Sequence, residues 1–201
     1  LKPVLHVIDR AEGVNRVATT NLMITNRGPL FLADTSINVD PSAKELAKIA
    51  HMTAQVVKMF GVDPVVALLS YNNFGSSPFP QAKKVAQAVS YLHRLHPNLI
   101  ADGPIQSDFA LNNKMLGERF PFSSLNNKKV NTLIFPNLDA ANITYKIIKE
   151  LGKTSSIGPI LMGLENSAHI LQLGASVDEM VNMAAIAGID AQEKLKLKSK
   201  I

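Results

Sequence analysis

The sequence predicts an α/β protein in which a mostly parallel sheet is covered by helices on both faces. The first observation is that short apolar runs, typical of buried strands, alternate with segments whose apolar residues recur at helical spacing. The second is the composition. A chain of 201 residues with 46% hydrophobic and 18% charged residues is expected to fold around a sizeable core and not to be disordered.

Two apolar runs near the start of the chain predict a β-hairpin. "VATTNLMIT" over 17–25 and "PLFLADTSI" over 29–37 flank Asn26-Arg27-Gly28, a sequence typical of a turn. We therefore expect these two runs to pair with each other before the alternation of strands and helices begins.

The segment over 40–61 predicts a helix with clear signals at both ends. Asp40 is expected as the N-cap, Pro41 at the first helical position and Gly61 as the stop. An apolar face at helical spacing is expected to pack on the sheet, and it consists of Leu46, Ile49, Ala50, Thr53, Val56, Val57 and Phe60.

The rest of the chain continues the alternation of strands and helices. The expected strands lie over 65–71, 98–103 and 130–136, and the expected helices over 81–95, 107–114 and 139–151. An apolar stretch over 157–163 follows, and after it a short strand, a glycine turn and a helix over 169–188.

Several classes of protein are excluded by composition. No apolar run approaches the roughly 18 residues that cross a bilayer, and we expect no signal peptide. With zero cysteines there is no disulfide framework and no thiolate zinc site. We expect a cytoplasmic protein without a membrane partner. Because the chain begins at Leu1 and not at methionine, we also expect it to be a piece of a longer polypeptide.

The net charge of +5 favours anionic partners. Much of the excess comes from Lys194, Lys196, Lys198 and Lys200, in a segment over 193–201 that we interpret as a solvated basic tail. The sequence has no nucleic-acid-binding motif and no basic patch interleaved with aromatic residues. Nucleic acid is therefore not an expected partner.

Ligands of open α/β sheets collect at the carboxyl ends of strands, where three loops, over 70–77, 135–142 and 158–166, are candidates. In the second loop, Asn137 or Asp139 is expected to cap the following helix, whose N-terminus suits a phosphate or another anion.

Two residues of this second loop have two possible roles. Asp139 has a purely structural alternative as a plain N-cap. Asn142, in the first turn of the helix, can hydrogen-bond either a ligand or a neighbouring loop.

The third loop takes its expected shape from Gly158, Pro159 and Gly163, which let a ligand approach the main chain. It is neither a GxGxxG sequence nor a P-loop with its lysine, so nucleotide chemistry of those two kinds is not expected.

The histidines give no metal site. His93 and His96 have a spacing that can bind metal, but no carboxylate sits beside them, and an ordinary helix end is the favoured interpretation. His169 is interpreted as a core histidine in preference to a pocket wall.

Several stretches of the chain are informative together. They are "LADTSINVDPSAKELAKIA", "ALLSYNNFGSS", "ADGPIQSDFAL", "LIFPNLDAANITYKIIKELG" and "SIGPILMGLENSAHILQLGASVDEMVNMAAIAGIDAQ". These stretches resemble the phosphate acetyl/butyryl transferases. The resemblance extends from Lys2 to about Gln192 and is strongest to the related C-terminal domain of bacterial NADP-dependent malic enzymes.

The resemblance implies an α/β/α sandwich of the isocitrate/isopropylmalate dehydrogenase-like type. This chain would be the second part of the family domain, without its N-terminal portion. Two subdomains with a cleft between them and a homodimer or higher homo-oligomer are also implied. If the malic enzyme interpretation holds, a malate-oxidising region with NADP and a divalent metal precedes this domain, which itself carries no cofactor.

Active members of the family move an acetyl group between coenzyme A and phosphate. The resemblance places their Ser-Arg pair at Gln172 and Leu173, and the Asp that takes the thiol proton at Glu179. Leucine has neither the charge nor the donors with which a guanidinium holds a phosphoryl group. Ser176 and Glu179 also fit a capping box, a structural role for Glu179. No catalytic residue is therefore expected.

The predicted function is a regulatory acetyl-CoA-binding and dimerisation domain of an NADP-dependent malic enzyme. The expected acyl-CoA contacts are Asn137, Asp139, Asn142, Gly158, Gly163 and Gln172. One alternative is an active phosphate acetyl- or butyryltransferase in which an arginine from elsewhere supplies the missing charge. Another is an assembly module without a ligand.

Overall fold

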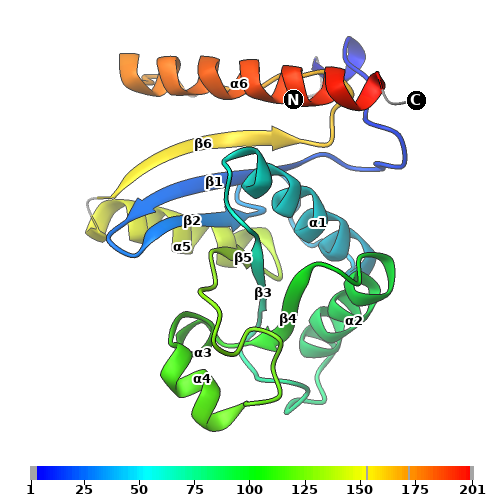
Figure 1. Ribbon diagram of the computed structural model, residues 1–201, viewed down its shortest axis with the longest axis vertical. Coiled ribbons are helices and arrows are strands. Elements are labelled where there is room, and N and C mark those ends of the chain that lie inside the picture. The colour runs from blue at the N-terminus through cyan, green and yellow to red at the C-terminus, as the bar shows by residue number, and fades with distance from the viewer. Residues whose placement is uncertain (1–3, 153, 172, 200–201) are drawn as a thin grey trace.

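The computed structural model describes residues 4–152, 154–171 and 173–199 of the chain (Figure 1). Within these residues a six-stranded sheet has the order β4-β3-β5-β2-β1-β6. The helices, in chain order, are η1 (Val4–His6), α1 (Ala43–Met59), α2 (Pro80–Leu95), α3 (Ser107–Leu111), α4 (Asn113–Arg119), α5 (Leu138–Gly152) and α6 (Val177–Lys198). The strands are β1 (Ala18–Thr25), β2 (Gly28–Ala33), β3 (Val65–Leu69), β4 (Ile100–Ile105), β5 (Thr132–Ile134) and β6 (Ser155–Met162).

The sheet is mixed, with the parallel part that the alternation of strands and helices predicts and an antiparallel part at one edge. Strands β2, β5, β3 and β4 pair in parallel, whereas β1 pairs antiparallel with both β2 and β6. The predicted hairpin of β1 and β2 is confirmed, with Thr25 opposite Gly28 across the turn. The buried pattern of β3 also confirms a strand that is covered on both faces.

The second strand ends at Ala33, so the prediction of a strand over 29–37 is wrong at its end. The buried carboxylate of Asp34 accepts hydrogen bonds from the Thr19 hydroxyl at 2.6 Å and from the backbone N–H groups of Ser36 at 3.1 Å and Asn38 at 3.0 Å. A side chain that binds its own following backbone competes with the sheet ladder, and it turns the chain here.

Helix α1 begins later than the sequence predicts. Asp40 is not the N-cap, and Pro41 is not the first helical residue. Ser42 is the N-cap, and with Glu45 it forms a capping box in which the Ser42 N–H donates to Glu45 Oε2 at 2.8 Å. The carboxylate of Asp40 pairs instead with Lys84 on α2.

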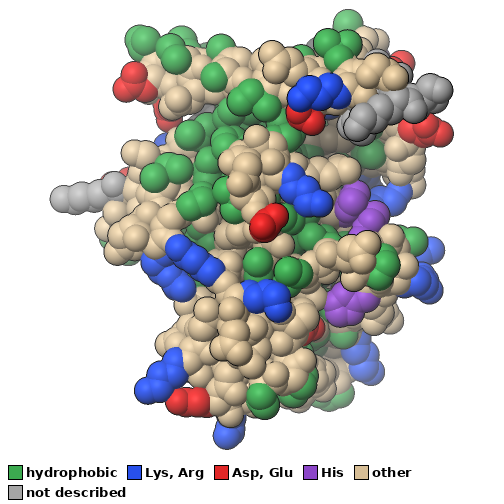
Figure 2. All heavy atoms as spheres, viewed as in Figure 1, with side chains coloured by type: hydrophobic (Ala, Val, Ile, Leu, Met, Phe, Trp, Pro, Cys, Tyr) green, Lys and Arg blue, Asp and Glu red, His purple; other side chains and the backbone are tan. Residues whose placement is uncertain are grey.

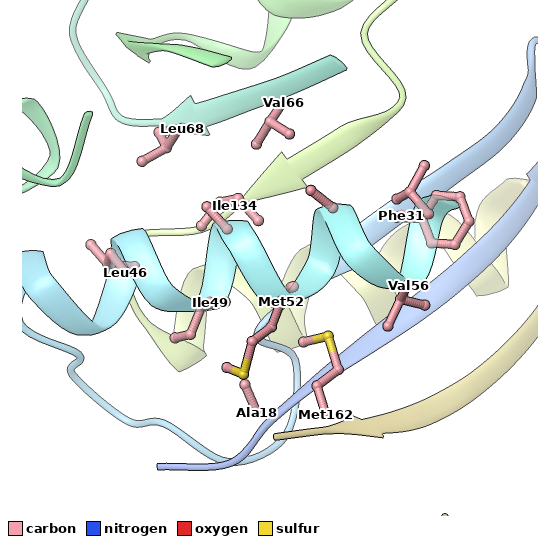
Figure 3. Close-up of a cluster of buried hydrophobic side chains, with 14 of the residues drawn as sticks. Ala18, Phe31, Leu46, Ile49, Met52, Val56, Val66, Leu68, Ile134 and Met162 are labelled. Atoms are coloured by element: carbon pink, nitrogen blue, oxygen red, sulfur yellow. The ribbon is translucent and has the colours of Figure 1, made fainter. Parts of the chain in front are cut away.

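Two separate cores lie on the two faces of the sheet. On one face, α1 and α2 pack on the sheet, joined by Met183 and Ile186 of α6, which lies along β6 (Figure 1). On the other face, α3, α4 and α5 cover the second core. Figure 3 shows Leu46, Ile49 and Met52 of α1 lying against side chains of the sheet. Each such buried side chain stabilises the fold by about 1.5–3 kcal/mol.

Two further segments differ from the sequence-based expectation. The single short helix predicted over 107–114 is two helices, because Asn112 leaves the helical conformation and its side chain accepts from the Met115 N–H at 3.2 Å to start α4. The lysine-rich end of the chain continues α6 as far as Lys198. None of the helices in the described part of the chain has the length and apolar character needed to cross a bilayer.

Candidate functional site

A small cavity of about 130 Å³ lies where α5, β6 and the start of α6 meet. The residues that matter for its chemistry are Tyr145, Lys149, Gly158, Leu173, Glu179 and Met183. The described residues of the stretch that resembles the family's catalytic loop therefore border a cavity.

Leu173 lines this cavity with its side chain fully exposed. At the position that the resemblance gives to an arginine, the cavity therefore presents hydrocarbon to solvent. A leucine offers an anion neither charge nor a hydrogen-bond donor.

Glu179 is committed to the start of α6, which confirms the predicted capping box. The Ser176 N–H donates to Glu179 Oε2 at 2.8 Å, and the Glu179 N–H donates to Ser176 Oγ at 3.2 Å. The hydrogen bond from the Ser176 backbone holds the pKa of Glu179 below its usual value. A carboxylate with a lowered pKa is a weaker base, so this contact opposes a role in taking up a thiol proton.

Lys149 is a cavity residue that the sequence interpretation did not single out. Its Nζ atom lies 3.9 Å from Glu179 Oε1, and about half of each side chain is exposed. On α5 it lies one turn after Tyr145, whose buried ring also lines the cavity. In the sequence, the four-residue spacing from Tyr145 places Lys149 on the same face of the helix. The sequence does not show that this lysine pairs with a residue of α6.

Two of the three predicted contacts at the start of α5, Asn137 and Asn142, have structural roles. The Asn137 side chain accepts from the Ala140 N–H at 2.9 Å and caps the helix, so of the two candidate caps Asn137 is the right one and Asp139 is not. Asn142 Nδ2 donates to the Thr35 carbonyl at 3.0 Å. Of the two predicted partners of Asn142, a ligand or a neighbouring loop, the structure shows the loop. None of these three predicted contacts lines the Lys149 cavity.

The third candidate loop is a strand in its first half, which corrects the prediction. Gly158 and Pro159 lie inside β6, and only Gly158 borders the cavity. A Cβ at residue 158 would lie 2.5 Å from Asn21 Oδ1, so this glycine is needed for packing against β1. At Gly163, where φ is +88°, a Cβ would lie 2.9 Å from Val14 Cγ1. The close approach expected at both glycines is to the protein itself. Gln172 lies outside the described residues.

His93 and His169 both make contacts within the protein. His93 Nε2 lies 2.7 Å from the Ala101 carbonyl, and His169 is buried, with Nδ1 accepting from the Leu161 N–H at 3.2 Å. Burial lowers the pKa of His169. His96 does not pair with His93 but stacks on His51. In the described ranges no three His, Asp or Glu side chains are grouped to hold a metal ion.

Comparison with known proteins confirms the family resemblance of the sequence and the fold. Residues 1–188 match the family model described as phosphate acetyl/butaryl transferase. The chain belongs to this family. Among curated relatives it is 39% identical over 194 residues to an NADP-dependent malic enzyme of Haemophilus influenzae, and 36% identical over 193 residues to a phosphate acetyltransferase of Helicobacter pylori.

Solved phosphotransacetylases share the fold of this family member. A phosphotransacetylase from Streptococcus pyogenes superposes with a TM-score of 0.91 and 36% identity over 96% of this chain. The EutD phosphotransacetylase from Staphylococcus aureus gives 0.88 and 32% over 94% of this chain. The chain spans 26% of the Haemophilus malic enzyme, 37% of the Helicobacter transferase and 58–59% of these two solved chains.

Proposed function

We propose that this chain of the phosphate acetyl/butyryl transferase family binds acetyl-CoA or a related acyl-CoA without transforming it. The chain would act as the regulatory and dimerisation domain of an NADP-dependent malic enzyme, whose malate-oxidising region would hold the NADP and the divalent metal. The identity to malic enzymes over nearly the whole chain supports this assignment as well as the identity to transferases supports the alternative. The chemistry of the cavity favours the first.

The single observation that carries the proposal is the fully exposed Leu173 at the cavity. Acyl transfer to phosphate needs a cation for a group with close to two negative charges, and removal of one oriented electrostatic contact costs about 10²–10³ in rate. With leucine at residue 173, the loop itself supplies no such contact.

The charges that remain in the cavity compensate each other. Lys149 and Glu179 lie 3.9 Å apart and carry opposite charges, so the pair adds no net charge to the cavity. A neutral thioester has no large anionic group at this point and needs no cation. The cavity is thus better suited to the acyl end of an acyl-CoA than to acetyl phosphate.

Regulation by such a ligand requires two arrangements of the assembled enzyme with different affinities for acetyl-CoA. Equal affinity for both arrangements would change nothing in malate decarboxylation. The cavity lies between α5 and the start of α6, so acetyl-CoA bound there would alter how α6 sits on the rest of the domain. The predicted homodimer is part of this proposal and is checked by sedimentation of the complete protein.

One observation favours an active phosphate acetyl- or butyryltransferase as the second candidate. Lys149 is a cation beside Leu173 and Glu179 in the same cavity. In that reaction Glu179 would take the proton of the coenzyme A thiol, and the sulfur would attack the acyl carbon of acetyl phosphate. The C–O bond to phosphate would break, and phosphate would leave beside Lys149. This candidate needs Lys149 to release Glu179 and bind the phosphoryl group.

An assay on the complete gene product separates these candidates. We expect acetyl-CoA formation from acetyl phosphate and coenzyme A to be at least about 10² slower than in active relatives, because the cation at residue 173 is missing. Turnover close to that of active relatives, lost in Lys149→Gln and kept in Lys146→Gln, would instead establish the transferase. Lys146 is a matched control because it is exposed on α5 and does not line the cavity.

Calorimetry with acetyl-CoA tests the binding itself. We expect saturable binding to the complete protein and a change in the rate of malate decarboxylation on saturation. Leu173→Arg adds a guanidinium beside the cavity, and we expect it to raise the affinity for acetyl phosphate about tenfold. No heat with acetyl-CoA would leave the third candidate, an assembly module without a ligand.

A further inference from the structure

A second and larger cavity, of about 460 Å³, lies between the helices α1 and α2. Its walls are the second half of α1, the connection to β3, and the segment that joins the end of α2 to β4. It shares no lining residue with the Lys149 cavity. Its volume falls within the range of about 300–1,000 Å³ that is usual for small-molecule sites, whereas that of the Lys149 cavity does not.

Basic side chains face this cavity from two elements. Lys58 and His51 come from α1, and His96 follows the last turn of α2. In Figure 2 the visible histidine side chains lie on the side of the molecule with α1 and α2, whereas lysine and arginine side chains are spread over the whole face. Asp63 is the only carboxylate in the lining, and Lys58 forms no ion pair with a described residue. The basic groups therefore outnumber the acidic one.

The two imidazoles are stacked, with ring centroids 3.5 Å apart and planes at 5° to each other. Such parallel rings cannot direct their in-plane lone pairs at one metal ion, so the pair is not a metal site. A helix C-terminus favours basic residues and accounts for Lys58 in the last turn of α1. It does not account for His51, which lies two turns earlier and reaches His96 across the cavity wall.

Burial keeps the His51 ring neutral in the free protein. Desolvation, followed by the charges of His96 and Lys58, lowers the pKa of His51 to about 4. The other basic groups of α2 nearby are occupied, because His93 lies against the Ala101 carbonyl and Arg94 stacks on the Tyr91 ring. An anion in the cavity would favour the protonated form of His51, which burial disfavours.

The remaining walls are largely apolar. Ala54, Pro64, Leu95, Pro97 and Leu99 line the cavity beside the two imidazole rings. Apolar walls with a few convergent polar groups are typical of sites for small organic ligands. We propose that this cavity is a second binding site of the domain. Its ligand would be a small organic phosphate whose planar or apolar part lies on these walls and whose phosphate group lies among Lys58, His51 and His96.

Two probes test this site on the complete protein. Phenyl phosphate carries a ring and a phosphate group, and inorganic phosphate carries the anion alone. We expect phenyl phosphate to bind with a Kd on the order of a millimolar, and inorganic phosphate more weakly. Lys58→Gln should weaken phenyl phosphate about tenfold, because it removes the permanent charge. Lys58 is exposed, so this variant leaves the core intact.

Two matched variants separate this site from other lysines and from the proposed function. Lys83→Gln removes an exposed lysine of α2 outside the cavity, and Lys149→Gln changes the first cavity. We expect both to bind phenyl phosphate like the wild type. Absence of saturable binding, or equal affinity in Lys58→Gln and the wild type, would overturn the proposal. Neither outcome depends on whether the protein binds or converts acetyl-CoA, so this test is independent of the proposed function.

Proton uptake gives an independent measurement. Benzenesulfonate keeps its single negative charge at all relevant pH values, so any proton that is bound with it belongs to the protein. We expect its affinity to rise about two- to threefold between about pH 7.5 and pH 5.5, with heats that depend on the ionisation enthalpy of the buffer. His51→Phe keeps a ring stacked on His96 but cannot bind the proton, and it should reduce this pH dependence. A pH-independent affinity would contradict the role of the imidazoles.

Discussion

At the scale of single residues, His51 connects the stability of the fold to pH. Burial, together with His96 and Lys58, lowers its pKa from 6.5 to about 4. Between these values the unfolded chain binds a proton that the folded chain does not bind. The stability that the neutral ring contributes is therefore fully present above pH 6.5 and is lost as the pH falls toward 4.

We expect the free energy of unfolding to decrease between about pH 7.5 and pH 5, with about 1 kcal/mol of the loss due to His51, which is half-buried and partly screened by water. Urea unfolding of His51→Phe, which keeps a ring beside His96, should show a loss smaller by that amount. The buried His169 contributes in the same direction in both proteins. His6→Phe, at an exposed position, is the control. Equal losses in His51→Phe and the wild type would rule out this role.

The residue contacts that sequence alone predicts are the local ones. Ser176 and Glu179 are three residues apart, so their capping box follows from the order of the residues. Lys149 meets Glu179 from another helix, and His96 meets His51 across two elements. No periodicity or motif marks such pairs, because they depend on how the helices pack. This explains why the cation of the candidate site was missed.

At the scale of the elements, α1 and α6 begin with the same capping box but differ in burial. Leu46 in the first turns of α1 is buried, whereas Val177 and Val181 of α6 are largely exposed. We expect Ser42→Ala to lower the global free energy of unfolding by about 1 kcal/mol. Ser176→Ala should mainly open the first turn of α6, with faster amide exchange over 177–181 and little change in urea unfolding.

Amide exchange and urea unfolding of both variants measure this difference directly. Gly188 lies in the middle of α6 and a Cβ there meets no other atom, so Gly188→Ala serves as a control that favours the helix. An equal global loss in the two cap variants would show that the start of α6 is as strongly packed as that of α1.

Element types were more predictable than their ends. The spacing of the apolar residues predicted α1, α2, α5 and the central strands. It could do so because this spacing depends only on which face of an element is buried. Asp34 ended β2 early through hydrogen bonds to its own backbone. Gly158 and Pro159 were read as a loop, but they lie within β6, where a glycine fits against Asn21 of the neighbouring strand. Both errors come from contacts that propensity does not contain.

At the scale of the whole molecule, the sheet order was not predictable from the sequence. The alternation of strands and helices indicates a covered, mostly parallel sheet, but β5 lies between β2 and β3, and β6 returns to the edge beside β1. These positions place α5 on one face and α6 along the edge (Figure 1). The Lys149 cavity lies where these two helices and β6 meet. The arrangement follows from burying apolar residues on both faces at once.

The two cores share the strands of one sheet, and we expect them to unfold as one unit. Leu92 of α2 belongs to the first core and Leu116 of α4 to the second, and both side chains are fully buried. Each substitution to alanine should lower the free energy of unfolding by about 2–5 kcal/mol, and Leu151→Ala, at an exposed position, by less than about 0.5 kcal/mol.

Thermal unfolding followed by helical circular dichroism and by tyrosine fluorescence tests this cooperativity in the complete protein. Both core variants should lower the Tm of this domain by the same amount with either probe, because the strands connect the two faces. If Leu116→Ala instead produced an early transition that Leu92→Ala does not share, the segment with α3 and α4 would unfold on its own. The two faces of the sheet would then be separate cooperative units.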